Sequence, residues 1–391
     1  GGNAGRELTS DKASNVMTQR TNYRLRYMRI IALALATQLY GATASAADDA
    51  AVLDRATAVV PVEPATALKA LKSLGKRYRK LHEVYASAMR EAKIPEDRQA
   101  AFRNFAPQMV FIDELFTFEK RWRGTDAALA ALNCLARNAL SVSDTDDPVF
   151  QARERVGEIL KAQYISSPQL DLILPMFHGL RASAVAEPLF LAASRSSDPR
   201  VRACATYHRA MFLEENSAST VGLADLRQSV SRDKNEEHFE RLTVMLAHLA
   251  KVGFTPETAP ARRQAALELL HELQKDANAI RQRQWFPFLE VLDQQDRIDI
   301  DQGAGRPTYA ELAERLEFAI TALAVGSVVP EIDAQDPAGQ PLKLSSFRGK
   351  VTVLIFSADW CDPCVAMYPQ LRELIEKHDR DRFAVVSVTG D

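Results

Sequence analysis

The sequence predicts a multi-domain protein, with a mainly α-helical array followed by a partial α/β fold. The chain has 391 residues, which is long for a single domain. Between about residues 65 and 324, apolar residues recur at helical spacing. After Gly326 the pattern changes to β-branched runs separated by glycines and prolines. We therefore divide the chain into residues 1–46, 47–325 and 326–391.

The composition is that of a globular protein, with 47% hydrophobic and 26% charged residues. The 49 Lys and Arg nearly balance the 51 Asp and Glu, so the chain lacks the basic excess that nucleic-acid binding requires. Four cysteines are too few for a disulfide scaffold. Nucleic acid is therefore not an expected partner, and the function has to come from a local site.

Residues 1–46 are predicted to be an upstream extension and a secretory signal peptide. Met17 and Met28 are both candidate starts. Arginines, the apolar run Ile30–Tyr40 and the small residues ending at Ala46 follow in the order of a signal peptide cleaved after Ala46. We expect export to the periplasm or cell envelope. An N-terminal membrane anchor is the alternative, although Ile30–Ala46 is short for a membrane span.

Residues 47–325 are predicted to form successive helices joined by brief turns. Asp147 and Asp198 are placed as N-caps, each followed by a proline at the first helical position. Pro168 and Pro260 also stand where a helix would begin. The apolar residues at helical spacing include Leu68, Leu71, Leu74 and Tyr78, and then Leu129, Leu132, Leu135 and Leu140.

One stretch of this region resembles a HEAT-type repeat. Residues 198–205 fit the D-P-x-V-R-x-x-A pattern that opens the second helix of such a repeat, and Leu189–Ser197 would be the partner helix. No fixed period recurs along the chain. We therefore expect an array of HEAT-like or α-solenoid type, which would either present a concave binding surface or serve as a spacer.

The helical region offers no metal-binding pattern. His271-Glu272 begins an H-E-x-x-H zinc pattern, but Lys275 stands where the second histidine is needed. Cys134 and Cys204 lie among apolar helical neighbours and are expected in the core, with a disulfide between them left open. The run Arg281-Gln282-Arg283 is interpreted as a solvated face.

The C-terminal segment carries a C-x-x-C motif in a strand–helix–strand context. Val351–Phe356 is expected to be a buried central strand, because it is a continuous β-branched run. Trp360-Cys361-Asp362-Pro363-Cys364 follows at once, then a helical pattern over Val365–Ile375 and a second strand over Phe383–Val388. This context is typical of a redox-active dithiol.

The spacing of the two cysteines gives them different expected roles. A cysteine at a helix N-terminus lies near free N–H groups and the positive end of the helix dipole, which favour the nucleophilic thiolate. Cys361 is therefore expected to attack a substrate disulfide, and Cys364, one turn later, to resolve the mixed disulfide. Pro363 is tolerated in the first turn, whereas Pro369 is expected to bend the helix.

Asp362 has two opposing electrostatic consequences. Its carboxylate beside Cys361 disfavours a second negative charge on the sulfur, while its own place in the first helical turn suits the helix dipole. The sequence leaves the net effect on Cys361 open.

Together these residues resemble the thioredoxin-like domain of TlpA/ResA-type thiol–disulfide oxidoreductases, in the redoxin (AhpC/TSA) group. The matching residues are Gly326 and Pro330, then Leu344–Lys350, then Phe356–Cys364 in the place of F-W-A-x-W-C-x-P-C, and finally Pro369 and Leu371. The resemblance implies a redox-active Cys361–Cys364 disulfide with Trp360 packed beside it. Pro363 matches the family pattern, whereas Asp362 departs from it, since family members usually have Pro or Gly there; we expect both residues to support the pair. It implies no further cofactor or metal. The implied partners are proteins with thiols or disulfides and an unidentified electron donor or acceptor.

The family fold continues with a helix, two strands, a final helix and a cis-proline loop that faces the dithiol. This chain stops at Asp391, before those elements. We therefore expect the segment to be the N-terminal part of a longer domain, which raises the question of its competence as an enzyme.

Two alternative functions stay open. A peroxiredoxin-like antioxidant is disfavoured, because its P-x-x-x-T-x-x-C context needs Thr where Ala358 stands. A helical interaction or scaffold protein with a degenerate redox domain is favoured by the missing cis-proline loop and opposed by the intact C-x-x-C. Whether the chain would act as reductase, oxidase or isomerase depends on its redox potential.

Overall fold

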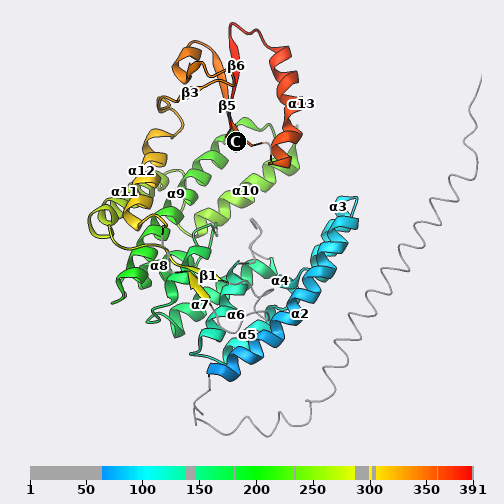
Figure 1. Ribbon diagram of the computed structural model, residues 1–391, viewed down its shortest axis with the longest axis vertical. Helices are drawn as coiled ribbons and strands as arrows, with labels where there is room; N and C mark the ends of the chain where they lie inside the picture. The colour runs from blue at the N-terminus through cyan, green and yellow to red at the C-terminus, as the bar shows by residue number, and fades with distance from the viewer. Residues whose placement is uncertain are drawn as a thin grey trace, which may run out of the picture. The chain divides into compact units, whose positions relative to one another are not determined.

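The structure is a computed structural model that describes residues 64–137, 147–179, 181–232, 235–286, 299–301, 305–358 and 360–389 (Figure 1). The predicted signal peptide, its alternative as a membrane anchor, and Leu140 lie outside these residues. None of the described helices is both long and apolar enough to span a membrane.

The first described helices are α2 (Pro64–Glu91), α3 (Pro95–Phe105), α4 (Pro107–Val110), α5 (Ile112–Arg121) and α6 (Asp126–Arg137). The apolar faces predicted on α2 and α6 are confirmed, except that Leu68 is only half-buried. On α2, Leu71, Leu74 and Tyr78 are buried, and α6 buries Leu129, Leu132 and Leu135. The apolar stripe of each helix thus packs into the core at the expected spacing.

The next elements are α7 (Pro148–Gln163), the 3₁₀ turns η1 (Leu170–Leu172) and η2 (Leu174–Met176), α8 (Ala186–Ala193), α9 (Pro199–Ser229), α10 (Glu236–Lys251) and α11 (Ala259–Asp276). The predicted N-caps are confirmed. The carboxylate of Asp147 accepts from the Val149 amide at 2.7 Å, and that of Asp198 accepts from the Arg200 amide at 2.8 Å. Each bond satisfies an amide that the helix leaves without a partner.

Two expectations for the helical region are corrected. Pro168 starts no α-helix, because the chain after it folds into η1 and η2. A short antiparallel pair, β1 (Gln284–Phe286) and β2 (Asp299–Asp301), interrupts the helices. Each strand has only three residues, too few to show the alternation that identifies a strand in a sequence. The chain returns to helix in α12 (Tyr309–Ala322), where Thr308 and Glu311 form a capping box.

A helix pair is present at the HEAT-like stretch as α8 and the first half of α9, which pack against one another. The partner helix differs from the predicted Leu189–Ser197, because α8 begins at Ala186 and ends at Ala193. Glu187 of α8 accepts from Arg209 of α9 at 3.2 Å and from Arg262 of α11 at 2.8 Å. Gly253 has φ +86°, a conformation that favours glycine, and a Cβ there would lie only 2.6 Å from the guanidinium of Arg262. A side chain at this position would therefore crowd the Arg262–Glu187 ion pair. This part of the chain is a helical array, while its solenoid arrangement stays a prediction.

The interpretation of Arg281-Gln282-Arg283 as a solvated face is wrong for Arg283. Its side chain is 9% exposed and forms a bidentate ion pair with Asp171, which is 1% exposed. It also donates to the carbonyl of Pro168 at 2.7 Å. The partner lies 112 residues earlier, so no local pattern could reveal it. Arg281 is exposed, as predicted.

The prediction that both helical-region cysteines lie in the core is confirmed for Cys204 and holds in part for Cys134. Cys204 is fully buried, its Sγ lies 3.4 Å from the carbonyl oxygen of Asp171, and burial raises the pKa of its thiol. Cys134 is half-buried, and no disulfide joins the two cysteines.

Two histidines hydrogen-bond to one another inside the helical region. The Nδ1 atoms of His178 and His208 are 3.1 Å apart, so one imidazole donates and the other accepts. Burial lowers the pKa of both rings, and for His208 the charge of His178 adds to this effect. The charged groups that act on the pair are Glu215 of α9, which favours protonation of His178, and Arg153 of α7, which opposes it.

The C-terminal segment contains β3 (Asp333–Gln335), β4 (Pro341–Lys343), the 3₁₀ turn η4 (Leu344–Phe347), β5 (Val351–Ser357), α13 (Asp362–Lys377) and β6 (Phe383–Thr389). β3 and β4 form an antiparallel hairpin. β5 and β6 are parallel, in register from Val351 opposite Phe383 to Ser357 opposite Thr389. The predicted strand–helix–strand order around the C-x-x-C motif is confirmed (Figure 1).

The expectation that Val351–Phe356 is a buried central strand is corrected. Val351 is 68% and Phe356 69% exposed, and the residues between them are half-buried. Among the described strands, β5 pairs only with β6, whereas a buried parallel strand needs partners at both edges and cover on both faces.

The histidine pair predicts that stability falls on acidification. Folded imidazoles with lowered pKa values bind fewer protons than the unfolded chain, so stability decreases as pH falls below about 6.5. For His208, whose pKa burial holds well below its usual value, the loss should be on the order of 1 kcal/mol between about pH 7.5 and 5.5. Urea unfolding followed by circular dichroism should show a smaller pH slope in His208→Gln than in the parent chain. His238→Gln, at a half-buried position of α10, is the control, and equal slopes in all three proteins would contradict the prediction.

The buried ion pair predicts that Arg283 contributes much more to the free energy of unfolding than the exposed Arg281. Arg283→Met leaves the Asp171 carboxylate buried without its partner and should lower the free energy of unfolding by ~3–5 kcal/mol. Adding Asp171→Asn to that variant should recover part of the loss, because no charge is then buried. Arg281→Met should cost ~1 kcal/mol or less. Equal losses in the two single arginine variants, measured by urea unfolding, would refute this account.

Candidate functional site

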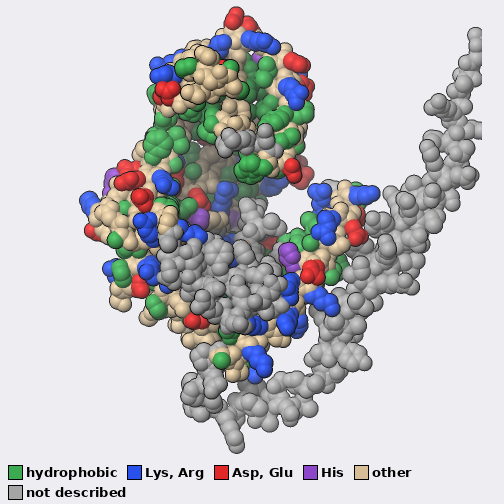
Figure 2. Space-filling view, in the orientation of Figure 1, with side chains coloured by type: hydrophobic (Ala, Val, Ile, Leu, Met, Phe, Trp, Pro, Cys, Tyr) green, Lys and Arg blue, Asp and Glu red, His purple; other side chains and the backbone are tan. Residues whose placement is uncertain are grey.

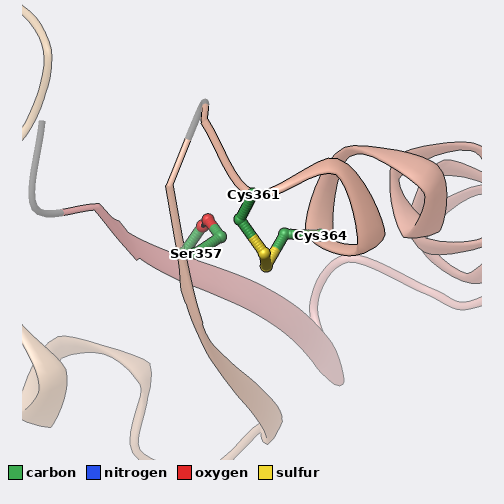
Figure 3. The surroundings of a disulfide bond; sticks show 4 residues. Ser357, Cys361 and Cys364 are labelled. Carbon is green, nitrogen blue, oxygen red and sulfur yellow. Dashed lines mark hydrogen bonds between the residues drawn. A yellow bond between two sulfur atoms is a disulfide. The ribbon is translucent and has the colours of Figure 1, made fainter. Parts of the chain in front are cut away.

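The two predicted cysteines meet at the N-terminus of α13. Cys361 is the N-cap residue, Cys364 lies in the first turn, and a disulfide joins them (Figure 3). Their Cα atoms are 5.2 Å apart, within the range that a disulfide spans. Two sulfurs held at this distance can pass between disulfide and dithiol, taking up or releasing two electrons and two protons.

The local sequence explains why the chain turns into a helix between the cysteines. β5 ends at Ser357, and the Cys361 amide then donates to the carbonyl of Ala358 at 3.1 Å to close a turn. The carbonyl of Cys361 accepts from the amides of Cys364 at 2.9 Å and Val365 at 3.0 Å. Pro363, at the second helical position, loses no helical bond there, as predicted.

The helix terminus offers few donors to a sulfur atom. Pro363 has no N–H, and the amides of Cys364 and Val365 already donate to Cys361. In the first turn, the donors left for a thiolate on Cys361 are the Asp362 amide and, in the reduced protein, the thiol of Cys364. The exposed Asp362 carboxylate stands in the same turn, where the helix dipole favours it.

Trp360 directly precedes the disulfide and is 83% exposed. Its packing beside the cysteine pair, which the resemblance implies, stays a prediction. Phe356, Val365 and Met367 are also exposed to solvent. Figure 2 shows hydrophobic side chains at the surface of the segment that carries β5 and α13. Exposed apolar area beside a disulfide provides a surface that another protein can contact.

A serine pair, of which Ser357 lies next to the disulfide, was missed by the sequence reasoning. The hydroxyl oxygens of Ser357 on β5 and Ser387 on β6 are 2.9 Å apart. The available signal was that Ser357 stands where the F-W-A-x-W-C pattern has Trp. Its partner could not be found from the sequence, because it depends on the register between β5 and β6.

Other polar groups singled out in the sequence have structural partners. His271 of α11 contacts Glu317 of α12 at 2.8 Å, and Gln274 donates to the same carboxylate. Within the described part of the chain, no group of three or more His, Cys, Asp or Glu side chains is arranged to hold a metal ion.

Comparison with known proteins gives a family match in this same segment. The profile of the AhpC/TSA family matches residues 325–391. Thiol-disulfide oxidoreductase ResA of Geobacillus thermodenitrificans is 34% identical over 68 residues, and that of Geobacillus kaustophilus 35% over 68 residues; each match covers 17% of this chain and 39% of the relative. Tryparedoxin of Trypanosoma brucei brucei is 43% identical over 51 residues, covering 13% of this chain and 35% of the relative.

The chain thus spans about 39% of the length of the ResA proteins that it matches. No solved structure matches the chain. The matched residues include both cysteines, the strand before them and the helix and strand after them. The C-terminal segment of this chain is therefore an AhpC/TSA-family domain segment, related to thioredoxin-like thiol–disulfide oxidoreductases.

Proposed function

We propose that the protein exchanges disulfides with substrate proteins through the Trp360-Cys361-Asp362-Pro363-Cys364 motif. The observation that carries this proposal is the disulfide at the start of α13, with Cys361 at the N-cap and Cys364 in the first turn. A disulfide across one helical turn closes a very short loop and therefore adds little stability. We infer that this disulfide serves a redox reaction in which it is repeatedly formed and broken.

In the reducing direction, the thiolate of Cys361 attacks one sulfur of a substrate disulfide. The substrate S–S bond breaks, its other sulfur leaves as a thiolate and takes up a proton, and a mixed disulfide with Cys361 remains. The thiolate of Cys364 then attacks the Sγ of Cys361, which releases the second substrate thiol. Two electrons have passed to the substrate, and the Cys361–Cys364 disulfide must be reduced by a separate thiol donor. The oxidising direction is the reverse.

The neighbouring residues suit these steps. Trp360 presents an exposed apolar ring next to the nucleophile, where a substrate chain would lie. Pro363 fixes the backbone of the first turn. We assign no further cofactor, because the two sulfurs carry the electrons themselves.

We place this activity in the periplasm or cell envelope, where substrate proteins contain disulfides. The support for this placement is the arrangement of charged, apolar and small residues that ends at Ala46. The electron donor or acceptor would then be another thiol protein of the same compartment.

The two cysteines should respond differently to mutation. We expect Cys361→Ser to lower the rate of insulin disulfide reduction at least ~100-fold, because the nucleophile is lost. Cys364→Ser should instead accumulate a mixed disulfide between Cys361 and the substrate, visible by intact mass and released by dithiothreitol. A chain in which Cys361→Ser keeps the parent rate would not use this mechanism.

Cys204, in the helical region, provides an internal reference for the alkylation rate of Cys361. Burial raises the pKa of the Cys204 thiol, so little thiolate is present at neutral pH. In the reduced native chain we expect iodoacetamide to modify Cys204 at least ~100-fold more slowly than Cys361, and to modify it readily in urea. Peptide mass spectrometry measures both rates. Modification of native Cys204 at the rate of Cys361 would contradict the prediction.

A further inference from the structure

Two paired serine hydroxyls, that of Ser357 next to the disulfide and that of Ser387, have no part in the mechanism described so far. Ser357 is the last residue of β5, and Ser387 lies near the end of β6, with their Oγ atoms 2.9 Å apart. Figure 3 shows the side chain of Ser357 next to the Cys361–Cys364 disulfide.

The strand register brings the two hydroxyls together. Ser357 is opposite Thr389, and Ser387 is opposite Ile355, so both serines stand on the same face of the parallel pair. The turn closed by the Cys361 amide on the carbonyl of Ala358 then carries the chain back toward that strand end. Ser357 and the start of α13 are therefore held as neighbours by backbone hydrogen bonds.

A thiolate on Cys361 needs hydrogen-bond donors, and the helix terminus supplies few of them: the Asp362 amide and, in the reduced protein, the thiol of Cys364. Pro363 has no N–H, and the amides of Cys364 and Val365 donate to the Cys361 carbonyl. The Asp362 carboxylate adds negative charge in the same turn. A neutral hydroxyl is the kind of donor that can approach a thiolate without adding charge.

We propose that the Ser357–Ser387 hydroxyl pair positions and hydrogen-bonds the Cys361 thiolate in the reduced protein. Ser387 donates to Ser357, and the hydroxyl proton of Ser357 is then available to the sulfur. A disulfide sulfur is a weak acceptor and a thiolate a strong one, so this bond stabilises the reduced form selectively. Ser357 is thus a positioning residue, and the inference rests on the proposed role of the dithiol.

The direct test measures the pKa of Cys361 in the full chain carrying Cys364→Ala. The rate of iodoacetamide modification at Cys361, followed by mass spectrometry against pH, gives this pKa. Ser357→Ala should raise it by about one pH unit, since hydrogen bonds to charged groups are the stronger ones. Ser357→Thr keeps a hydroxyl and should restore the parent value. Ser346→Ala, in η4, is the matched control and should change nothing.

A second measurement uses the dithiol without a protein substrate. In the chain with both cysteines, Ser357→Ala should shift the equilibrium constant against a glutathione buffer about tenfold toward the disulfide, equivalent to about 30 mV. An unchanged Cys361 pKa in Ser357→Ala would overturn the proposal. So would a rise that Ser357→Thr fails to reverse, because the cause would then be packing. Both measurements stand even if the chain reduces no protein disulfide, which would count against the proposed function alone.

Discussion

The geometry of the C-terminal segment depends on one requirement, that a disulfide joins residues three positions apart. An extended chain places such residues too far apart, whereas the first turn of a helix brings their Cα atoms to 5.2 Å. β5 must therefore end before the first cysteine, a turn must follow, and α13 must begin directly after Cys361. The same arrangement places Cys361 at the positive end of the helix dipole and leaves Trp360 exposed beside it. The chemistry proposed for the chain is a consequence of this strand-to-helix turn.

The helical region depends instead on buried polar contacts between residues far apart in the chain. Asp171 and Arg283 hold the segment before β1 against η1, and the His178–His208 bond joins the turn after η2 to α9. The carboxylate of Glu119 on α5 accepts from Tyr164 at the C-terminus of α7 at 2.9 Å. Each of these groups would be costly to bury alone, so each contact favours a single arrangement of the helices.

Local features of the fold could be predicted from the sequence, because their causes are local. The N-caps Asp147 and Asp198 act on amides two or three residues away, and the C-x-x-C spacing determines where α13 begins. The partners of Arg283 and Ser357 could not be predicted, since they depend on the tertiary fold and on strand register. The three-residue strands β1 and β2 and the exposure of Val351 were missed for a similar reason, because pairing and cover come from other parts of a chain.

The central claim is that Cys361 and Cys364 form a pair that the protein oxidises and reduces in use. The most direct measurement is a redox titration of the full chain in glutathione buffers, with alkylation and intact mass at each potential. The account predicts a single two-electron transition that adds two alkylated sites at Cys361 and Cys364, at a potential above about −300 mV. A pair that stays oxidised across the whole range, as structural disulfides do, or one that never forms, would contradict it.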